Sequence, residues 1–413
     1  MTGIKNNKSK INFLDIYSLF LFTLYPLAII SGNLLINIFI FLLAFNFIYN
    51  FKNNIIFLKQ KIFYILLFFF ISLVINLIFS TNFENTAPRV IKFFFVIFFI
   101  FEIQRIIQKF ESSYLKNIYK FFFIIFIILN LDIIFEIIFG QNMLGFTVEM
   151  PGRIASFFGD ELVVGAFYHG FILIFLSYLF YSNLNKNFII LFIFSIILIS
   201  FLIGERANFI KSFISIIIFI FIVFKINYKT KISIIFIMLI AFISIVNLNQ
   251  EYKYRYYKQI KPLFSVDGYF DFMKKSQYGA HRIAAYKMFE ENMYFGVGIK
   301  NFRHEVKKDK YEDNRYQFTN QRLATHPHQV HHEFLSETGM IGYISFLIFI
   351  LFSLILAIKN YTKTKNLYQL SGIIFVVTSL MPLLPSGSFF STLTSGIFWF
   401  NFSLMVGYNK IKF

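Results

Sequence analysis

With 413 residues, 57% of them hydrophobic, and a mean hydropathy of +0.66, the chain is too apolar for a soluble globular protein. Its net charge of +18 does not indicate nucleic-acid binding, because the basic residues stand in short clusters between apolar runs, as in the cytoplasmic loops of membrane proteins. The sequence has no cysteine, which excludes disulfide bonds and thiolate chemistry.

The chain begins with a polar, basic stretch, residues 1–10, that leads into the first apolar run without a small-residue cleavage site after it, as in a signal anchor. Twelve apolar runs then approach the length of about 20 residues that a helix needs to cross a bilayer. We therefore predict transmembrane helices near 11–30, 34–50, 62–80, 90–104, 117–140, 161–182, 187–204, 209–225, 231–248, 336–358, 367–384 and 389–409. This divides the chain into nine helices over 1–248, a large loop over 249–335 and three helices over 336–413.

The Lys and Arg residues between these helices predict the topology. The two termini and the even connections hold 19 of them, and the short odd connections hold 5. Because basic residues stay in the cytoplasm, both termini are expected there and the odd connections outside. The remaining 15 lie in the segment 249–335, which is too long to count in this comparison and is external by parity.

The segment 249–335 is expected to be ordered in part. Residues 252–272 alternate aromatics with Lys, a pattern typical of a stretch on the lipid headgroups. A short amphipathic helix is predicted near 281–292, with Gly296 and Gly298 ending it. Ten acidic and fifteen basic residues leave the loop near +5, which suits an anionic ligand or lipid headgroups, although a solvated charged loop would have the same composition.

Among the arginines on the predicted external side, against the usual topological bias, are Arg153, Arg206 and Arg282. A guanidinium is a rigid fork of donors that matches phosphate oxygens and keeps its charge. Together these groups would form a site for a lipid diphosphate. The alternative is that each one caps a helix end or pairs with an acid, as Arg206 would with Glu205 or Asp160.

The segment 326–333 is rich in histidine. His328 and His332 would share a helical face at a spacing of four residues, but no cysteine or well-spaced carboxylate completes a zinc site, so no metal is expected. His328 is better interpreted as a general base or hydrogen-bond donor at an external, partly desolvated site. An interfacial histidine without a role is the alternative, and it applies more strongly to His331 and His332.

Few charged or titratable residues fall within the predicted spans: Asp15, Glu102, Asp132, Glu136 and His169. Asp132 and Glu136 lie one helical turn apart near an outer helix end, where they would face the same cavity or pair with an arginine inside the bundle. No series of acids crosses the middle of the membrane, as a proton-coupled transporter would require.

Taken together, these motifs closely resemble the signature of the O-antigen ligase and O-antigen polymerase superfamily. Order, spacing and topology agree over about residues 140–345, and the first four helices agree only in hydropathy. The matching stretches are 282–302, 326–329, 335–339 with Gly342, and the two shorter arginine motifs at 153–159 and 204–206.

The resemblance implies a bundle of twelve helices of the membrane glycosyltransferase (GT-C) type, with a large periplasmic loop between helices nine and ten. Its members move a glycan from undecaprenyl diphosphate to an acceptor sugar. Carried over by motif, Arg153, Arg206 and Arg282 would bind the diphosphate and His328 would activate the acceptor hydroxyl. Residues that would support them are His326, Gln329, Glu337, Asp132 and Glu136.

The sequence departs from the family pattern in two places. Gln329 follows the histidine where asparagine is usual, and it keeps the amide. Asp160 and Glu161 replace a common Asn and Pro pair and place negative charge beside the proposed phosphate site.

The chemistry also follows from the residues alone. A sugar diphosphate is an activated donor whose leaving group arginines can neutralise, without a metal, a nucleotide or another cofactor. In-line attack by an acceptor hydroxyl would invert the anomeric carbon. The leading hypothesis is a ligase that joins O-antigen to lipid A-core at the periplasmic face of a bacterial inner membrane. The alternative is a polymerase that extends the lipid-linked glycan, and a rival of another class is a lipid-linked oligosaccharide flippase or transporter.

Overall fold

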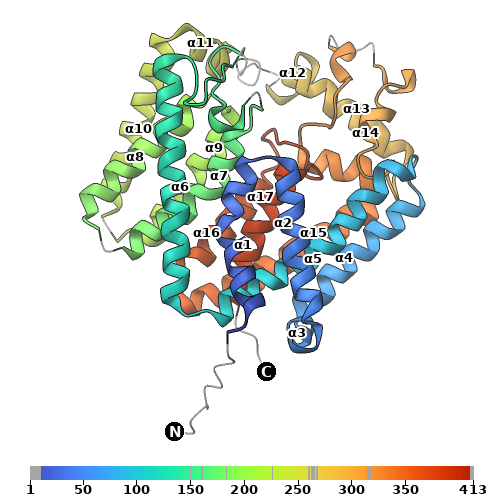
Figure 1. The fold of residues 1–413 in the computed structure, drawn as a ribbon. Helices are drawn as coiled ribbons and strands as arrows, with labels where there is room; N and C mark the ends of the chain where they lie inside the picture. The colour runs from blue at the N-terminus through green and yellow to red at the C-terminus, as the bar shows by residue number, and fades with distance from the viewer. Residues whose placement is uncertain are drawn as a thin grey trace.

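In the computed structural model, the described residues are 11–148, 150–159, 161–182, 184–225, 227–258, 261, 266, 268–313 and 318–409, and all their regular elements are helices (Figure 1). The α-helices are α1 Phe13–Ile30, α2 Asn33–Tyr49, α3 Phe51–Leu58, α4 Lys61–Ile78, α5 Phe83–Lys109, α6 Ser112–Phe139, α7 Val164–Tyr181, α8 Lys186–Leu202, α9 Arg206–Val223, α10 Tyr228–Leu248, α11 Gln250–Lys253, α12 Gly268–Lys274, α13 Gln277–Glu291, α14 Phe302–Glu305, α15 Val330–Thr364, α16 Leu367–Ser379 and α17 Thr392–Gly407.

Each of the twelve predicted apolar ranges contains a helix, and the chain is an α-helical integral membrane protein. Seven helices in the described part of the chain are long and apolar enough to cross a membrane, and α2 with α3, bent by 101°, makes an eighth if the pair is one span. The other helices of the twelve are short, or carry charges along their length as α5 does. The number of twelve spans stays a prediction.

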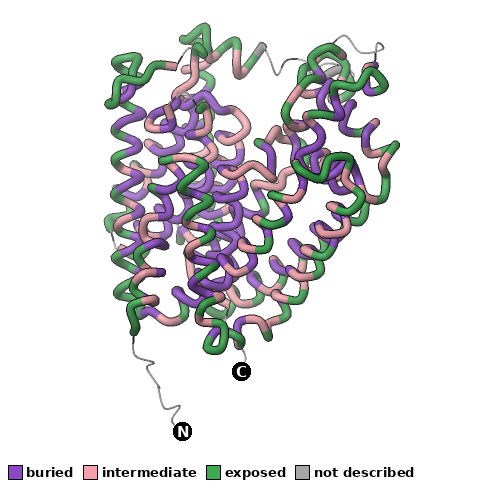
Figure 2. The backbone as a smooth tube through the Cα atoms, turned by 45° about the vertical axis from the view of Figure 1, so that its right-hand side comes forward, coloured by how far each residue is buried: buried purple, intermediate pink, exposed green. Residues whose placement is uncertain are grey.

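Helix α17 forms the centre of the bundle. It packs against α5, α16, α2 and α7, and its residues are buried from Leu393 to Gly407 apart from Thr394 (Figure 2). Gly372 of α16 permits a close backbone contact with α17, since a Cβ there would lie 2.7 Å from the Asn401 carbonyl oxygen. Large apolar side chains remain exposed on outer helices such as α4 and α10, as expected for a lipid-facing surface.

Helix α1 begins and α17 ends at one end of the bundle, and α11 to α14 lie at the opposite end (Figure 1). The predicted amphipathic helix is α13, whose first turn is capped by the Ser276 hydroxyl, which accepts a hydrogen bond from the Gly279 N–H at 3.0 Å. Gly296 and Gly298, predicted to end it, both have positive φ in the turn that follows.

The aromatic stretch of 252–272 differs from its predicted place on the headgroups. The rings of Tyr252 and Tyr256 stack on Phe201 of α8, with centroids 5.4 and 4.6 Å away, and both hydroxyls donate to backbone carbonyls there. Tyr254 and Tyr257 remain exposed. Two of the four tyrosines at 252–257 therefore anchor the loop to the bundle, and Phe264 lies outside the described residues.

Helix α15 begins at Val330, six residues before the predicted start of the tenth helix. It is broken at Gly339, where φ is 65°. Glycine is needed at this break, because the Tyr294 carbonyl oxygen lies 2.4 Å from the place a Cβ would occupy. Hydropathy did not reveal the first part, residues 330–338, because it is polar and buried under the loop segment.

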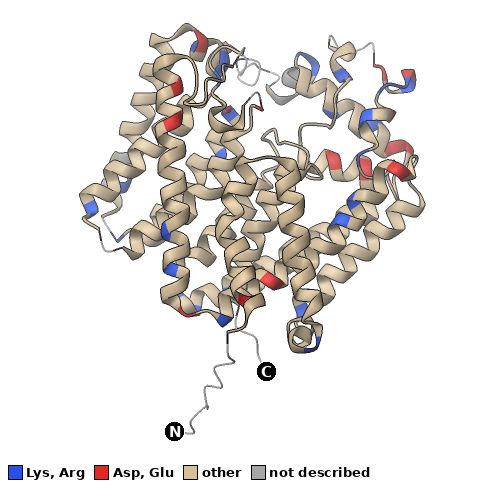
Figure 3. Cartoon of the chain, viewed as in Figure 1, with Lys and Arg blue, Asp and Glu red and all other residues tan. Residues whose placement is uncertain are grey.

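Buried charges gather at the end of the bundle where α1 begins (Figure 3). Arg105 donates to Asp15 at 2.5 Å and to Glu102 at 2.6 and 2.8 Å, and Lys109 reaches Asp15 at 2.6 Å. The in-membrane acids of α1 and α5 are thus paired with cations, as apolar surroundings require.

Replacing Arg105 with Met should destabilise the fold by about 3–5 kcal/mol, because it leaves two buried carboxylates without their shared cation. Thermal unfolding of the purified protein in detergent measures the change. Lys116→Met, at an exposed position of α6, is the matched control. An Arg105→Met variant with the same unfolding temperature as Lys116→Met would contradict this account.

Candidate functional site

Three arginines gather at the end of the bundle that carries the loop segment. Arg153 comes from the connection between α6 and α7, Arg206 is the first residue of α9, and Arg255 lies in the π-helical turn Tyr254–Lys258. Arg206 donates from Nη1 to the Arg255 carbonyl at 2.8 Å, and Arg255 donates from Nη2 to the Gly204 carbonyl at 3.0 Å. Burial lowers the pKa of Arg255, and the charges of Arg153 and Arg206 lower it further. We call these three residues the arginine cluster.

Close backbone contact holds two of these segments together. The Ile154 N–H donates to the Ile203 carbonyl at 3.2 Å, and a Cβ on Gly204 would lie 1.9 Å from the Gly152 carbonyl oxygen. Gly204 also has φ of 78°, so glycine is required for both reasons. The two arginine motifs predicted to share a site are in direct contact.

One carboxylate balances part of this charge. Glu205 is buried, and its Oε1 lies 3.4 Å from Arg153 Nη2. Burial raises the pKa of Glu205, and Arg153 opposes that rise. Glu205 thus pairs with Arg153 and not with Arg206, and Asp160, the other predicted partner, lies outside the described residues. Glu251 also lies here, since its Oε2 would be 3.5 Å from a Cβ on Gly152. Three guanidinium groups beside two carboxylates still leave an excess of positive charge that suits an anion.

Asp132 and Glu136 of α6 hold the Arg153 loop from below. Asp132 accepts from the Met143 N–H at 2.7 Å and from the Ser156 hydroxyl, and Glu136 accepts from the Ser156 N–H at 2.6 Å. Both buried carboxylates form hydrogen bonds with this loop, so they position Arg153 and do not face an open cavity.

Three aromatic rings surround the ring of His328. Its centroid lies 4.0 Å from that of His326, 5.0 Å from that of His281 and 5.6 Å from that of Tyr278. The His328 backbone is left-handed, with φ of 52°, and its carbonyl accepts from the Ser386 N–H at 2.9 Å. We call these four residues the histidine cluster.

Burial lowers the pKa of His328, so its ring is neutral near pH 7 and able to accept a proton. Burial and the neighbouring His328 also lower the pKa of His281, to about 4, and that of His326, to about 2. His326 is held by the Ser386 carbonyl at 3.3 Å, whereas no described residue forms a hydrogen bond with the His328 ring. The His328 ring is therefore available to a substrate hydroxyl.

Tyr278 connects the two clusters. Its ring packs on His328, and its hydroxyl interacts electrostatically with Arg255. The arginine cluster and the histidine cluster therefore act electrostatically on a shared residue.

Arg282, the third predicted arginine, lies on α13 one helical turn after Tyr278. It is 1% exposed, donates to the Leu383 carbonyl at 3.3 Å, and acts electrostatically on His281 and His332. Its role at the diphosphate stays a prediction.

The remaining predicted residues form hydrogen bonds with backbone groups. Gln329 caps α15: its Oε1 accepts from the His332 N–H at 2.9 Å, and its Nε2 donates to the Pro382 carbonyl at 2.8 Å. His331 lies between Leu380 and Tyr343. Glu337 accepts from the Lys300 N–H at 2.8 Å.

The helix starts after His328, so His328 and His332 do not share a helical face, and among the described residues no group of three metal-ligating side chains forms.

Sequence reasoning missed Arg255, Tyr278 and His281. Arg255 stands in the aromatic stretch interpreted as a headgroup contact, and His281 precedes Arg282, which drew attention instead. The pairing of Tyr252 and Tyr256 at helical spacing was the available signal that residues 252–256 pack inward.

Residues 188–347 match a protein-family model described as O-Antigen ligase. The matched range runs from α8 into α15 and holds the whole histidine cluster, Arg206, Arg255 and Arg282; Arg153 precedes it. No curated protein matches the chain.

Proposed function

Since the chain belongs to the O-antigen ligase and polymerase superfamily, we propose that it is a glycosyltransferase that moves a glycan from undecaprenyl diphosphate to an acceptor sugar. The observation that supports this proposal is that Tyr278, whose ring packs on His328, also interacts electrostatically with Arg255 of the arginine cluster. It links anion-binding groups to a neutral base, as transfer from a sugar diphosphate requires.

In the proposed reaction, the acceptor hydroxyl oxygen attacks the anomeric carbon while the bond from that carbon to the phosphate oxygen breaks. His328 takes the hydroxyl proton. Arg153, Arg206 and Arg255 neutralise the charge that develops on the leaving diphosphate. Attack from the face opposite the diphosphate inverts the anomeric carbon, and the arginines supply the charge that a metal ion would otherwise provide.

The proposed location is the periplasmic face of a bacterial inner membrane, with both termini in the cytoplasm. The basic residues counted along the sequence support this orientation. Transport of the lipid-linked glycan is less well supported, because the buried acids of α1 and α5 are paired with cations and those of α6 hold a loop.

Within this class we propose ligation of O-antigen to lipid A-core, with polymerisation as the alternative. Deleting the protein should leave long O-antigen on the lipid carrier and none on lipid A-core. Single-repeat product on lipid A-core would identify a polymerase. Unchanged lipopolysaccharide in the deletion strain would overturn both.

A further inference from the structure

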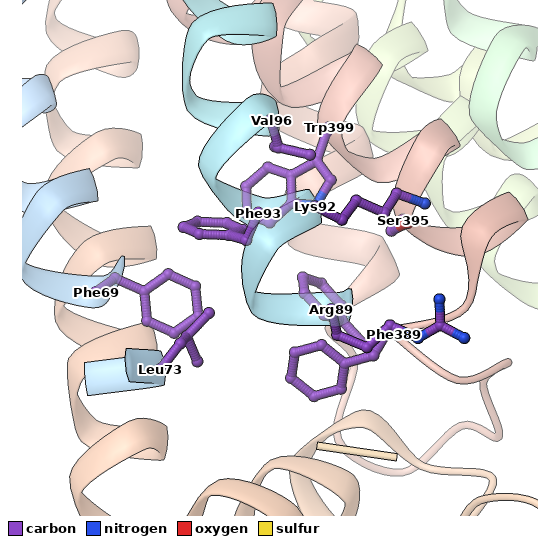
Figure 4. Close-up of a pocket in the computed structure, with 10 residues that line it drawn as sticks. Phe69, Leu73, Arg89, Lys92, Phe93, Val96, Phe389, Ser395 and Trp399 are labelled. Atoms are coloured by element: carbon purple, nitrogen blue, oxygen red, sulfur yellow. The ribbon is translucent and has the colours of Figure 1, made fainter. Parts of the chain in front are cut away.

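A second group of cations lies beside an open pocket between α4, α5 and α17 (Figure 4). The pocket is small and open, with a volume of about 30 Å³, and half of its lining residues are aromatic, including Phe93, Phe389 and Trp399. Arg89 and Lys92 of α5 supply its only charges among the described residues, and Figure 4 shows both side chains extending to the same side of the helix. We call it the α5 pocket.

The Lys92 ammonium forms no ion pair with the described residues. Its Nζ is enclosed, yet no described residue forms a hydrogen bond with it, and the same is true of Arg89 Nε. The charges of Arg89 and Lys300 act on Lys92 and repel it. An enclosed cation surrounded by aromatic rings and other cations is costly unless an anion binds there.

The nearby acids do not supply an anion to Lys92. Glu333 accepts from the Ser388 hydroxyl and from the Phe389 N–H at 2.7 Å, and Glu337 accepts from the Lys300 and Phe302 N–H groups. These two carboxylates face four cations: Arg89, Lys92, Lys300 and Arg303. The surplus of positive charge indicates an anionic ligand.

The α5 pocket borders the histidine cluster through one loop, residues 380–391. Ser386 binds the His328 carbonyl, Ser388 accepts from the Lys300 ammonium, and Phe389 lines the pocket. The arginine cluster approaches His328 from the side of α9 and Tyr278, whereas the pocket approaches from α5. Figure 3 shows basic residues on both helices, which lie on either side of α17.

We propose that the α5 pocket binds an anionic group of the acceptor glycan, a phosphate or a carboxylate, while the arginine cluster holds the donor diphosphate. This rests on the proposed function, since it assigns two anionic substrates to the two sides of one base. The compact charge of Lys92 binds the anion, and the aromatic wall covers the adjoining sugar.

The test is steady-state transfer by the purified full chain in proteoliposomes, with undecaprenyl-diphosphate-linked glycan as donor and lipid A-core from the deletion strain as acceptor. Lys92→Met should raise the acceptor KM at least tenfold and leave the donor KM within twofold. Lys92→Arg should restore most of the affinity. Lys307→Met, at an exposed position of the loop segment, is the matched control.

Two treated acceptors identify the anion. If a phosphate binds, the wild-type KM should be higher for phosphatase-treated acceptor. If a carboxylate binds, it should be higher for carboxyl-reduced acceptor. The Lys92→Met variant should have the same KM for untreated acceptor as for the acceptor whose treatment affects the wild type. An unchanged acceptor KM in Lys92→Met, a rise in the donor KM instead, or a wild type indifferent to both treatments would overturn the inference. Absence of any transfer by the wild type would overturn the proposed function itself.

Discussion

Replacing His328 with Ala should lower the rate of glycan transfer by about 10²–10⁴-fold, the contribution typical of a positioned general base. The His328 ring, unlike that of His326, forms no hydrogen bond with the described residues, and burial keeps its pKa below the usual value. The measurement is the initial rate of product formation in proteoliposomes at saturating donor and acceptor. Insertion and folding should be unchanged, because the contact of His328 with Ser386 uses its backbone carbonyl.

His304→Ala is the matched control, since His304 is exposed in the same loop segment. The acid limb of the wild-type rate should fall below pH 6.5, because the pKa of His328 is lowered and the ring stays neutral into mildly acidic buffer. A His328→Ala variant with the control's rate would exclude His328 as the base.

Replacing Arg206 with Ala should reduce kcat/KM for the donor by about 10²–10³-fold, as expected when one preorganised donor to a developing negative charge is removed. Arg206 also fixes the Arg255 backbone through its bond at 2.8 Å, so the variant disturbs two members of the arginine cluster. Arg206→Lys should recover only part of the rate, because an ammonium does not present the guanidinium fork.

Lys253→Ala is the control for Arg206, because it removes an exposed positive charge from the neighbouring turn. If Arg206→Ala and Lys253→Ala reduced kcat/KM equally, the effect would be one of general surface charge, and the arginine cluster would not be the donor site.

The apolar runs predicted where helices lie, because hydrocarbon favours helices whose backbone groups are satisfied within each segment. They did not predict α3, whose residues include Lys52 and two asparagines, or the polar beginning of α15. They also extended the last two helices into the loop at 380–391, where Pro382, Pro385 and Gly387 end them. That loop carries the contacts that hold His328.

The site was predictable where motifs lie on helix ends that meet. Arg153 and Arg206 come together because Gly152 and Gly204 allow their backbones to touch. The surroundings of Arg282 were not predictable, because they depend on how α13 packs against the loop at 380–391, which no local pattern reveals. Arg255 and His281 escaped notice because each stands beside residues with a stronger signal.

The most direct test of the central claim is transfer by the purified protein, with EDTA present, in proteoliposomes that hold undecaprenyl-diphosphate-linked glycan and lipid A-core. The account predicts glycan joined to the acceptor through an inverted linkage, with one undecaprenyl diphosphate released for each bond formed. Movement of the lipid-linked glycan across the bilayer without a new glycosidic bond would contradict it.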